Sequence, residues 1–200
     1  MVSLAVGRTD RPEETGLNSL VSSPRLAMLL FLAAEVMFFA GLVGAFLVFR
    51  MGSISWPPVG QPRLPVEWTL LNTVILLISS VAMWRANQSS QKSHGPETSV
   101  WLGATLFLGG VFLAVQGFEW VRLLEFGLTV SSGPFGFTFY TLVGCHAAHV
   151  TAGLVWLAVT FVREAASLRG YGSRPDLDLC RMFWYFVVAL WPVLFAIIYS

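Results

Sequence analysis

The chain has 200 residues, of which 56% are hydrophobic and 12% are charged, and its formal net charge is +1. Soluble globular domains carry about 25% charged residues, so this composition excludes an ordinary soluble domain, and the near-zero net charge gives no sign of a nucleic-acid partner. Runs of roughly 18 or more apolar residues can cross a bilayer as helices, which predicts an all-α, polytopic membrane protein built as a helical bundle.

Residues 1–24 are mostly polar and are predicted to form a cytoplasmic tail ahead of a five-helix transmembrane domain over 25–200. Pro24 is a helix-start signal for the first span, and the proline-rich segment 56–65 cannot continue a helix. The predicted transmembrane helices are, in chain order, about 25–50, 67–85, 99–124, 135–162 and 182–199.

Lysine and arginine are unevenly divided between the two sides of these spans. The tail and the connections after the second and fourth spans carry nine of the twelve, and the opposite side carries three. Because loops rich in Lys and Arg stay in the cytoplasm, we expect a cytoplasmic N-terminus and a C-terminus on the outer side. The nine are Arg8, Arg11, Arg25, Arg85, Lys92, Arg163, Arg169, Arg174 and Arg181, and the three are Arg50, Arg63 and Arg122.

Glu35 lies inside the first apolar span, where an isolated charge costs about 2.5–3.5 kcal/mol on insertion scales. With a helical rise of about 1.5 Å per residue, Glu35 lies about 15 Å and His149 of the fourth span roughly 20 Å from the cytoplasmic end. Asn72 of the second span reaches about the height of His149. We therefore predict a hydrogen bond between Glu35 and His149, with Asn72 in the same layer. The alternative is a neutral Glu35 carboxyl that bonds His149 for packing alone.

A second group of polar side chains is predicted nearer the outer side. Gln116 and Glu119 of the third span approach the level of His146 on the fourth. The alternative for Glu119 is a local ion pair with Arg122, which lies three residues further along the same helix.

The sequence HAAH at 146–149 places two histidines on one helix face, as a metal site would. Metal sites in helical bundles usually recruit three or four ligands from facing helices, whereas this chain has three histidines and His94 lies in a loop. A bis-histidine haem needs ligands on two facing helices. We therefore predict no metal, haem or catalytic residue on this chain, and expect each imidazole to bond a polar partner across the bundle.

Two glycine groups lie within the spans, in AGLVGA at 40–45 and in LGG at 108–110. Small residues allow helices to approach each other closely in a membrane. We expect both groups to be points of close helix packing.

Three arginines near span ends are candidate lipid contacts. A guanidinium can bind a phosphate through two parallel hydrogen bonds while its stem lies along apolar surface. The candidates are Arg50 and Arg63 on the outer side and Arg25 on the inner side. The alternative is that these side chains reach the interface without binding a particular lipid.

Five motifs occur in chain order: LFLAAEVMFFAGLVGAFLVFR, LNTVILLISSVAMWRA, FLAVQGFEW, GFTFYTLVGCHAAHVTAGLVWL and FWYFVVALWPVLFAIIY. Together they resemble subunit III of the haem-copper respiratory oxidases in its short five-helix form, over roughly residues 25–199. By this resemblance, the family's buried glutamate corresponds to Glu35, its two paired histidines to His146 and His149, and its Gln-x-x-Glu-Trp element to Gln116, Glu119 and Trp120.

The resemblance implies a non-redox accessory subunit of a proton-pumping terminal oxidase, cytochrome c oxidase, in a bacterial cell membrane. Such a subunit packs on catalytic subunit I among other oxidase subunits, and the haem and copper belong to those partners. It binds phospholipid and supports proton uptake, oxygen access and turnover stability in aerobic respiration.

Several alternatives and departures accompany this resemblance. An accessory subunit of a quinol oxidase or of a nitric oxide reductase is an alternative, as is a small transporter or channel, although transporters usually show internal repeats and broken helices. The long form of the family has two further N-terminal helices that enclose a lipid cleft, so we expect any cleft of this chain to be completed by a neighbouring subunit or left open to lipid. In the last helix, Tyr185 and Val188 stand where the family usually has histidine and aspartate.

Overall fold

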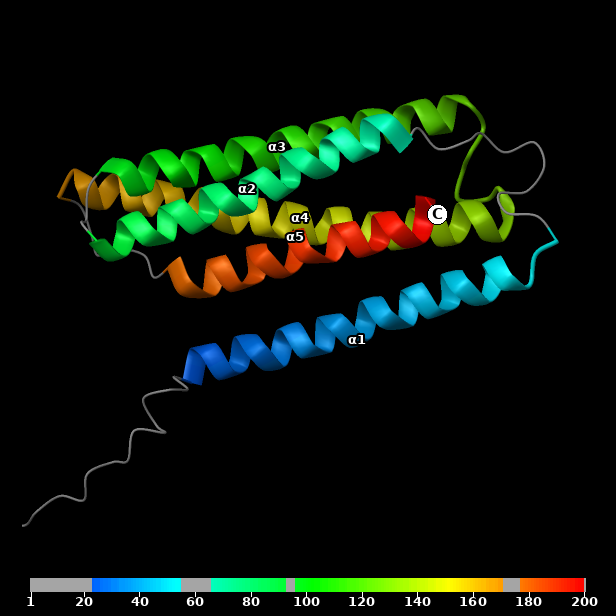
Figure 1. The fold of residues 1–200 in the computed structure, drawn as a ribbon, viewed down its shortest axis with the longest axis horizontal. Coiled ribbons are helices and arrows are strands. Elements are labelled where there is room, and N and C mark those ends of the chain that lie inside the picture. Colours follow the sequence, from blue (N-terminus) through cyan, green and yellow to red (C-terminus); the bar gives the residue numbers. More distant parts are fainter. Residues whose placement is uncertain (1–22, 55–65, 93–95, 171–176, 200) are drawn as a thin grey trace, which may run out of the picture.

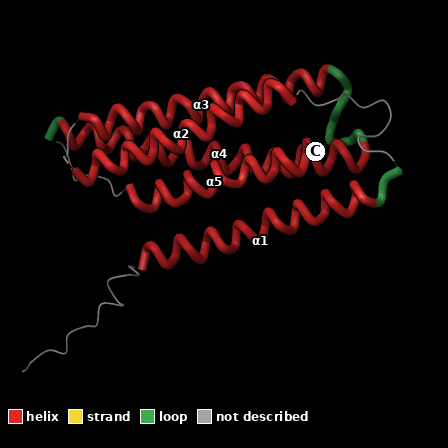
Figure 2. Tube along the Cα trace, in the orientation of Figure 1, coloured by secondary structure: helices red, strands yellow, loops and turns green. Residues whose placement is uncertain are grey.

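A computed structural model describes residues 23–54, 66–92, 96–170 and 177–199. Within these ranges the chain forms five helices and no strand (Figures 1 and 2). Each helix is long and apolar enough to cross a membrane, which confirms the prediction of an all-α polytopic membrane protein. The helices are α1 (Ser23–Met51), α2 (Val66–Lys92), α3 (Pro96–Glu125), α4 (Gly133–Leu168) and α5 (Leu177–Tyr199).

Three helices extend clearly beyond the predicted spans. α2 continues from the predicted end near residue 85 to Lys92, α4 continues from residue 162 to Leu168, and α5 begins at Leu177 rather than near residue 182. Hydropathy marks the stretch that lies in the membrane, whereas a helix continues wherever residues such as Ala, Gln, Lys and Glu favour it. A criterion based on apolar runs therefore does not detect the polar ends of these helices.

Successive helices run antiparallel, so the start of α1 lies at the same end of the bundle as the start of α5 (Figure 1). α2 and α3 form a hairpin, which contacts α5 through α2 and α4 through α3. α1 lies at the edge and, among the described residues, contacts α4 and α5 but neither α2 nor α3. α1 is consequently the helix with the least covered surface.

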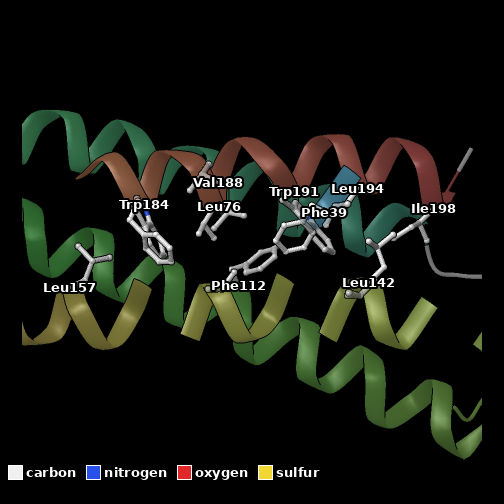
Figure 3. Packing of buried hydrophobic residues seen from close by; sticks show 14 of the residues in the cluster. Phe39, Leu76, Phe112, Leu142, Leu157, Trp184, Val188, Trp191, Leu194 and Ile198 are labelled. Atoms are coloured by element: carbon white, nitrogen blue, oxygen red, sulfur yellow. The ribbon is translucent and has the colours of Figure 1, made fainter. Parts of the chain in front are cut away.

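Two indoles of α5 lie in the centre of the core (Figure 3). Trp184 and Trp191 are seven residues apart, which places them on one face of the helix, and both are fully buried. Trp191 Nε1 donates to Thr73 Oγ1 at 2.9 Å, and Trp184 Nε1 donates to Ser79 Oγ at 3.3 Å. Because a buried N–H without a partner is costly, these two bonds favour one alignment of α5 along α2.

The Trp184 indole also explains one of the two glycine groups. A Cβ added to Gly109 would lie 2.7 Å from the Trp184 ring, so α3 can approach the core here only because the residue is glycine. Gly110, and Gly41 and Gly44 of α1, have nothing within 4 Å of the corresponding position among the described residues. The expected close packing is confirmed for Gly109. Gly41 and Gly44 lie on a face of α1 turned away from the rest of this chain, where close packing stays a prediction.

Candidate functional site

The predicted contact between the buried acid and the second histidine is confirmed. Glu35 Oε2 lies 2.9 Å from His149 Nε2 and so joins α1 to α4. Both side chains are largely buried, with 17% of Glu35 and 20% of His149 exposed. The Phe39 ring packs edge-on against the His149 ring with their centroids 5.1 Å apart. The pair is therefore bounded by apolar surface, in which a hydrogen bond is stronger than in water.

The other nitrogen of the His149 ring determines where the protons lie. His149 Nδ1 is 2.7 Å from the carbonyl oxygen of Cys145, and a carbonyl oxygen only accepts, so Nδ1 carries a proton. The contact between Nε2 and Oε2 then requires one more proton, on His149 or on Glu35, because two acceptors would otherwise face each other. In both arrangements the pair has no net charge, which lowers the cost of placing it inside a bilayer.

His146 lies one turn away on α4 but does not join this pair. It is 1% exposed, and its ring stacks on Trp191 at a centroid distance of 4.9 Å and faces Phe112 edge-on at 6.3 Å. Neither ring nitrogen has a hydrogen-bond partner in the part of the chain that the structure describes, so the expectation of a polar partner for each imidazole is wrong for His146. Residues three apart on a helix point about 60° away from each other, which lets His149 face α1 while His146 faces the core.

Asn72 does not contact the pair either. It is fully buried, and its Nδ2 donates to the carbonyl oxygen of Phe112 at 3.1 Å, which links α2 to α3. α2 contacts neither α1 nor α4 among the described residues, so the predicted common layer does not bring Asn72 to Glu35 or His149. Counting residues along a helix predicts the height of a side chain, whereas the helix that it faces depends on how the bundle packs.

Gln116 and Glu119 form a second polar cluster, between α2 and α3. Glu119 is 5% exposed, and its carboxylate accepts hydrogen bonds from Thr69 Oγ1 at 3.1 Å and from Gln116 Nε2 at 3.3 Å. Within the described ranges no ion pair joins Glu119 to Arg122, and the Arg122 guanidinium instead lies over the Phe118 ring at 6.0 Å. Thr69 was not predicted as a partner, because its only signal in the sequence is a hydroxyl near the start of an apolar span.

Two of the three candidate lipid-binding arginines have protein partners. Arg25 forms an ion pair with Asp178, whose second oxygen accepts a hydrogen bond from Arg181 at 2.6 Å. Arg50 Nη1 donates at 2.9 Å to a carbonyl oxygen near the other end of α5, and Arg63 lies outside the described residues. Arg25 and Arg50 thus tie α1 to both ends of α5, a task that needs no lipid.

Replacing Asp178 with asparagine should loosen the first turns of α1 without unfolding the bundle. The change removes the charge that Arg25 and Arg181 share. Because 52% of the Arg25 side chain is exposed, water screens the Arg25–Asp178 pair, and its loss costs less than about 1 kcal/mol. Amide hydrogen exchange should accelerate in the first half of α1 and stay unchanged in the second half. Asp178→Glu is the matched control, and equal exchange in both variants would contradict this role.

The residues present do not fit a metal centre. In the described part of the chain no three His, Cys, Asp or Glu side chains come together. Both nitrogens of His149 are engaged by protein groups, and His146 is enclosed by aromatic rings, while His94 lies outside the described residues. The described residues therefore offer no set of ligands for a haem or a copper ion.

The two departures in the last helix lie in different surroundings. Val188 is 3% exposed and belongs to the apolar core (Figure 3), where an aspartate would be a buried charge. The Arg181 guanidinium lies 6.0 Å from the centre of the Tyr185 ring, a distance at which a cation is attracted to an aromatic face. Tyr185 thus contacts a charged neighbour through its ring.

Comparison with known proteins agrees with the motifs in the sequence. The family model for cytochrome c oxidase subunit III matches residues 16–200. Cytochrome c oxidase subunit 3 of Bacillus subtilis is 32% identical over 175 residues, which cover 87% of this chain and 84% of that protein. The proteins of the same name from Synechocystis and Corynebacterium diphtheriae are 34% and 30% identical, over 86% and 98% of this chain and 73% and 97% of their own lengths.

Proposed function

Because the chain belongs to the cytochrome c oxidase subunit III family, we propose that it is the non-redox accessory subunit III of a proton-pumping terminal oxidase. The observation that carries the proposal is the family match over residues 16–200, which includes all five helices. Haem and copper lie in the partner subunits, chiefly subunit I. The names of the relatives favour a cytochrome c oxidase over a quinol oxidase or a nitric oxide reductase, and the family match argues against a transporter or channel.

The outward face of α1 supports packing on a larger partner such as subunit I. A row of exposed residues that includes two glycines and an alanine follows this face over four turns, and helices approach closely in membranes where such small residues lie. No other helix among the described residues covers it. The row consists of Ala34, Met37, Gly41, Gly44 and Val48.

The distribution of charge supports an orientation in a bacterial cell membrane. Six of the described Lys and Arg residues lie at the end of the bundle where α1 begins, and two lie at the other end. By the rule that positive loops stay inside, the N-terminus is cytoplasmic. Lipid headgroups at the two interfaces then meet Arg25, which is half exposed beside Asp178, and Arg50.

The Glu35–His149 pair is proposed to tune the complex rather than to carry out its chemistry. Neither group can carry an electron, so oxygen reduction proceeds in subunit I. A pair that shares one proton inside the bilayer can still influence proton uptake or the packing of subunit I through its protonation state. Phospholipid on the outer surface of the bundle supports oxygen access from the membrane.

Isolation of the native complex tests this function directly. An affinity tag on this chain should retrieve larger subunits together with haem, which an optical spectrum of the purified material detects. Gly44→Phe on the outward face of α1 should reduce the haem retrieved per tagged chain. Gly117→Phe, at an exposed α3 position with nothing within 4 Å of the Cβ site, is the matched control. Isolation of the wild-type chain alone and free of haem would refute the proposal, and loss of haem in the control instead would move the contact to α3.

A further inference from the structure

A cavity of about 620 Å³ lies between the start of α2 and the end of α3. Its walls include Trp68, Phe118 and Phe126, which are all largely exposed. Ala114 and Val115 line it one turn further toward the middle of α3. A volume of roughly 300–1,000 Å³ with aromatic walls is the usual size of a small-molecule site.

Two charged groups of opposite sign share this cavity. Glu119 and Arg122 both line it, three residues apart on α3, and the described ion pairs do not include one between them. The Glu119 carboxylate accepts hydrogen bonds from Thr69 and Gln116, but a carboxylate has about four acceptor positions, so it can accept further hydrogen bonds from a ligand. Arg122 is exposed and can meet an anionic group through its guanidinium.

The depth of the cavity matches the headgroup boundary of a bilayer. α3 has 30 residues and is therefore about 45 Å long, which exceeds a hydrocarbon layer of about 30 Å by about 7 Å at each end. Glu119 lies about 9 Å before the end of α3 at Glu125, close to that boundary. From there the apolar wall formed by Ala114 and Val115 continues toward the middle of the bilayer.

We propose that this cavity binds one phospholipid with an ethanolamine headgroup. Its ammonium donates to Glu119, its phosphate is held by Arg122, and one acyl chain lies along Ala114 and Val115. A primary ammonium offers N–H donors to a carboxylate, whereas a choline headgroup has none and a glycerol headgroup has no positive charge. The inference rests on the lipid-binding part of the proposed function, and it names the place and the lipid class.

The test uses the purified oxidase complex that contains this chain. The complex is reconstituted into vesicles of equal parts phosphatidylethanolamine, phosphatidylcholine and phosphatidylglycerol with identical acyl chains, extracted in mild detergent, and analysed for retained lipid by mass spectrometry. The lipid that the wild type retains and Ala114→Phe loses defines the site, because the new ring fills the deep end of the cavity from an exposed position.

Among the lipid molecules that the wild-type complex retains and the Ala114→Phe complex loses, ethanolamine lipid should exceed choline lipid about tenfold. This is the ratio that one charge-assisted hydrogen bond supplies. Glu119→Gln should bring the ratio close to one, and Arg122→Gln should reduce retention of all three lipids. Glu125→Gln, which removes an exposed carboxylate on the same helix, is the matched control and should change neither.

Three outcomes would overturn the proposal. They are equal amounts of ethanolamine and choline lipid at the site, lipid retention that Ala114→Phe does not change, and loss of a neighbouring subunit from the Ala114→Phe complex, which would place a protein helix in the cavity. A wild-type complex that retains no phospholipid at all would contradict the broader lipid-binding function, so the two failures are distinguishable.

Discussion

Replacing Glu35 with glutamine should lower the initial turnover of the oxidase modestly while leaving its assembly intact. A glutamine amide has the size of the carboxyl and can donate to His149 Nε2, because Nδ1 already holds its proton against the Cys145 carbonyl. The variant therefore keeps the link between α1 and α4 but fixes the pair in one protonation state. We expect haem to be retained in the partner subunit and activity to be lost faster over repeated turnovers.

Glu35→Ala should be more damaging than Glu35→Gln. Removing the carboxyl leaves His149 Nε2 without its partner in a largely buried position, at a cost of about 1–3 kcal/mol. The only polar contact between the middle of α1 and α4 among the described bonds disappears with it. Oxygen consumption should therefore start lower and decay faster than in the glutamine variant, and co-purified subunit I should fall.

Glu164→Gln is the matched control for both variants, because Glu164 is a buried carboxyl on α4 that is 4% exposed and does not contact the pair. Initial oxygen consumption and its decay during turnover are the measurements, with the haem spectrum as the assay of assembly. Complete loss of oxygen reduction in an assembled Glu35→Gln complex would make Glu35 essential to the chemistry. Wild-type rate and lifetime in both Glu35 variants would reduce Glu35 to a packing residue.

The common depth of Glu35 and His149 could be predicted from the sequence, and their contact also requires that α1 packs beside α4. Both residues are polar groups in apolar spans, and a hydrogen bond between them at the same depth lowers the free-energy cost of placing each one inside the bilayer. The fates of His146 and Asn72 could not be predicted in this way. They depend on which helix each side chain faces, and that follows from the arrangement of five helices rather than from the period of any one of them.

The ends of the helices and the ion pairs between them were also beyond the reach of sequence patterns. Asp178 lies in the first turn of α5, outside the apolar run. It nevertheless binds both Arg181, three residues away on the same helix, and Arg25, which is 153 residues away in the sequence. A carboxylate in a polar segment has many candidate partners. Only the parallel packing of α1 beside α5 brings Arg25 to Asp178, whereas Arg181 lies three residues further along α5 itself.

Replacing Gly109 with alanine should destabilise the bundle, whereas the same change at Gly110 should not. A Cβ on Gly109 would lie 2.7 Å from both Leu154 Cδ2 and Trp184 Cη2, closer than real side chains pack. The Leu154 methyl can move, but the Trp184 indole is fully buried and is also packed against Gly153. Forcing an extra methyl into such a core costs about 1–3 kcal/mol.

The measurement is the thermal unfolding midpoint of the purified complex in detergent. Gly110→Ala is the matched control, because nothing lies within 4 Å of its Cβ position and alanine favours a helix over glycine by up to about 1 kcal/mol. The midpoint should fall for Gly109→Ala and should not fall for Gly110→Ala. Trp184→Phe removes part of the ring that the new methyl would strike, so the penalty of Gly109→Ala should shrink in the Trp184→Phe background. Equal midpoints for the two alanine variants, or an undiminished penalty in the double variant, would show that α3 and α5 do not meet through Gly109 and Trp184.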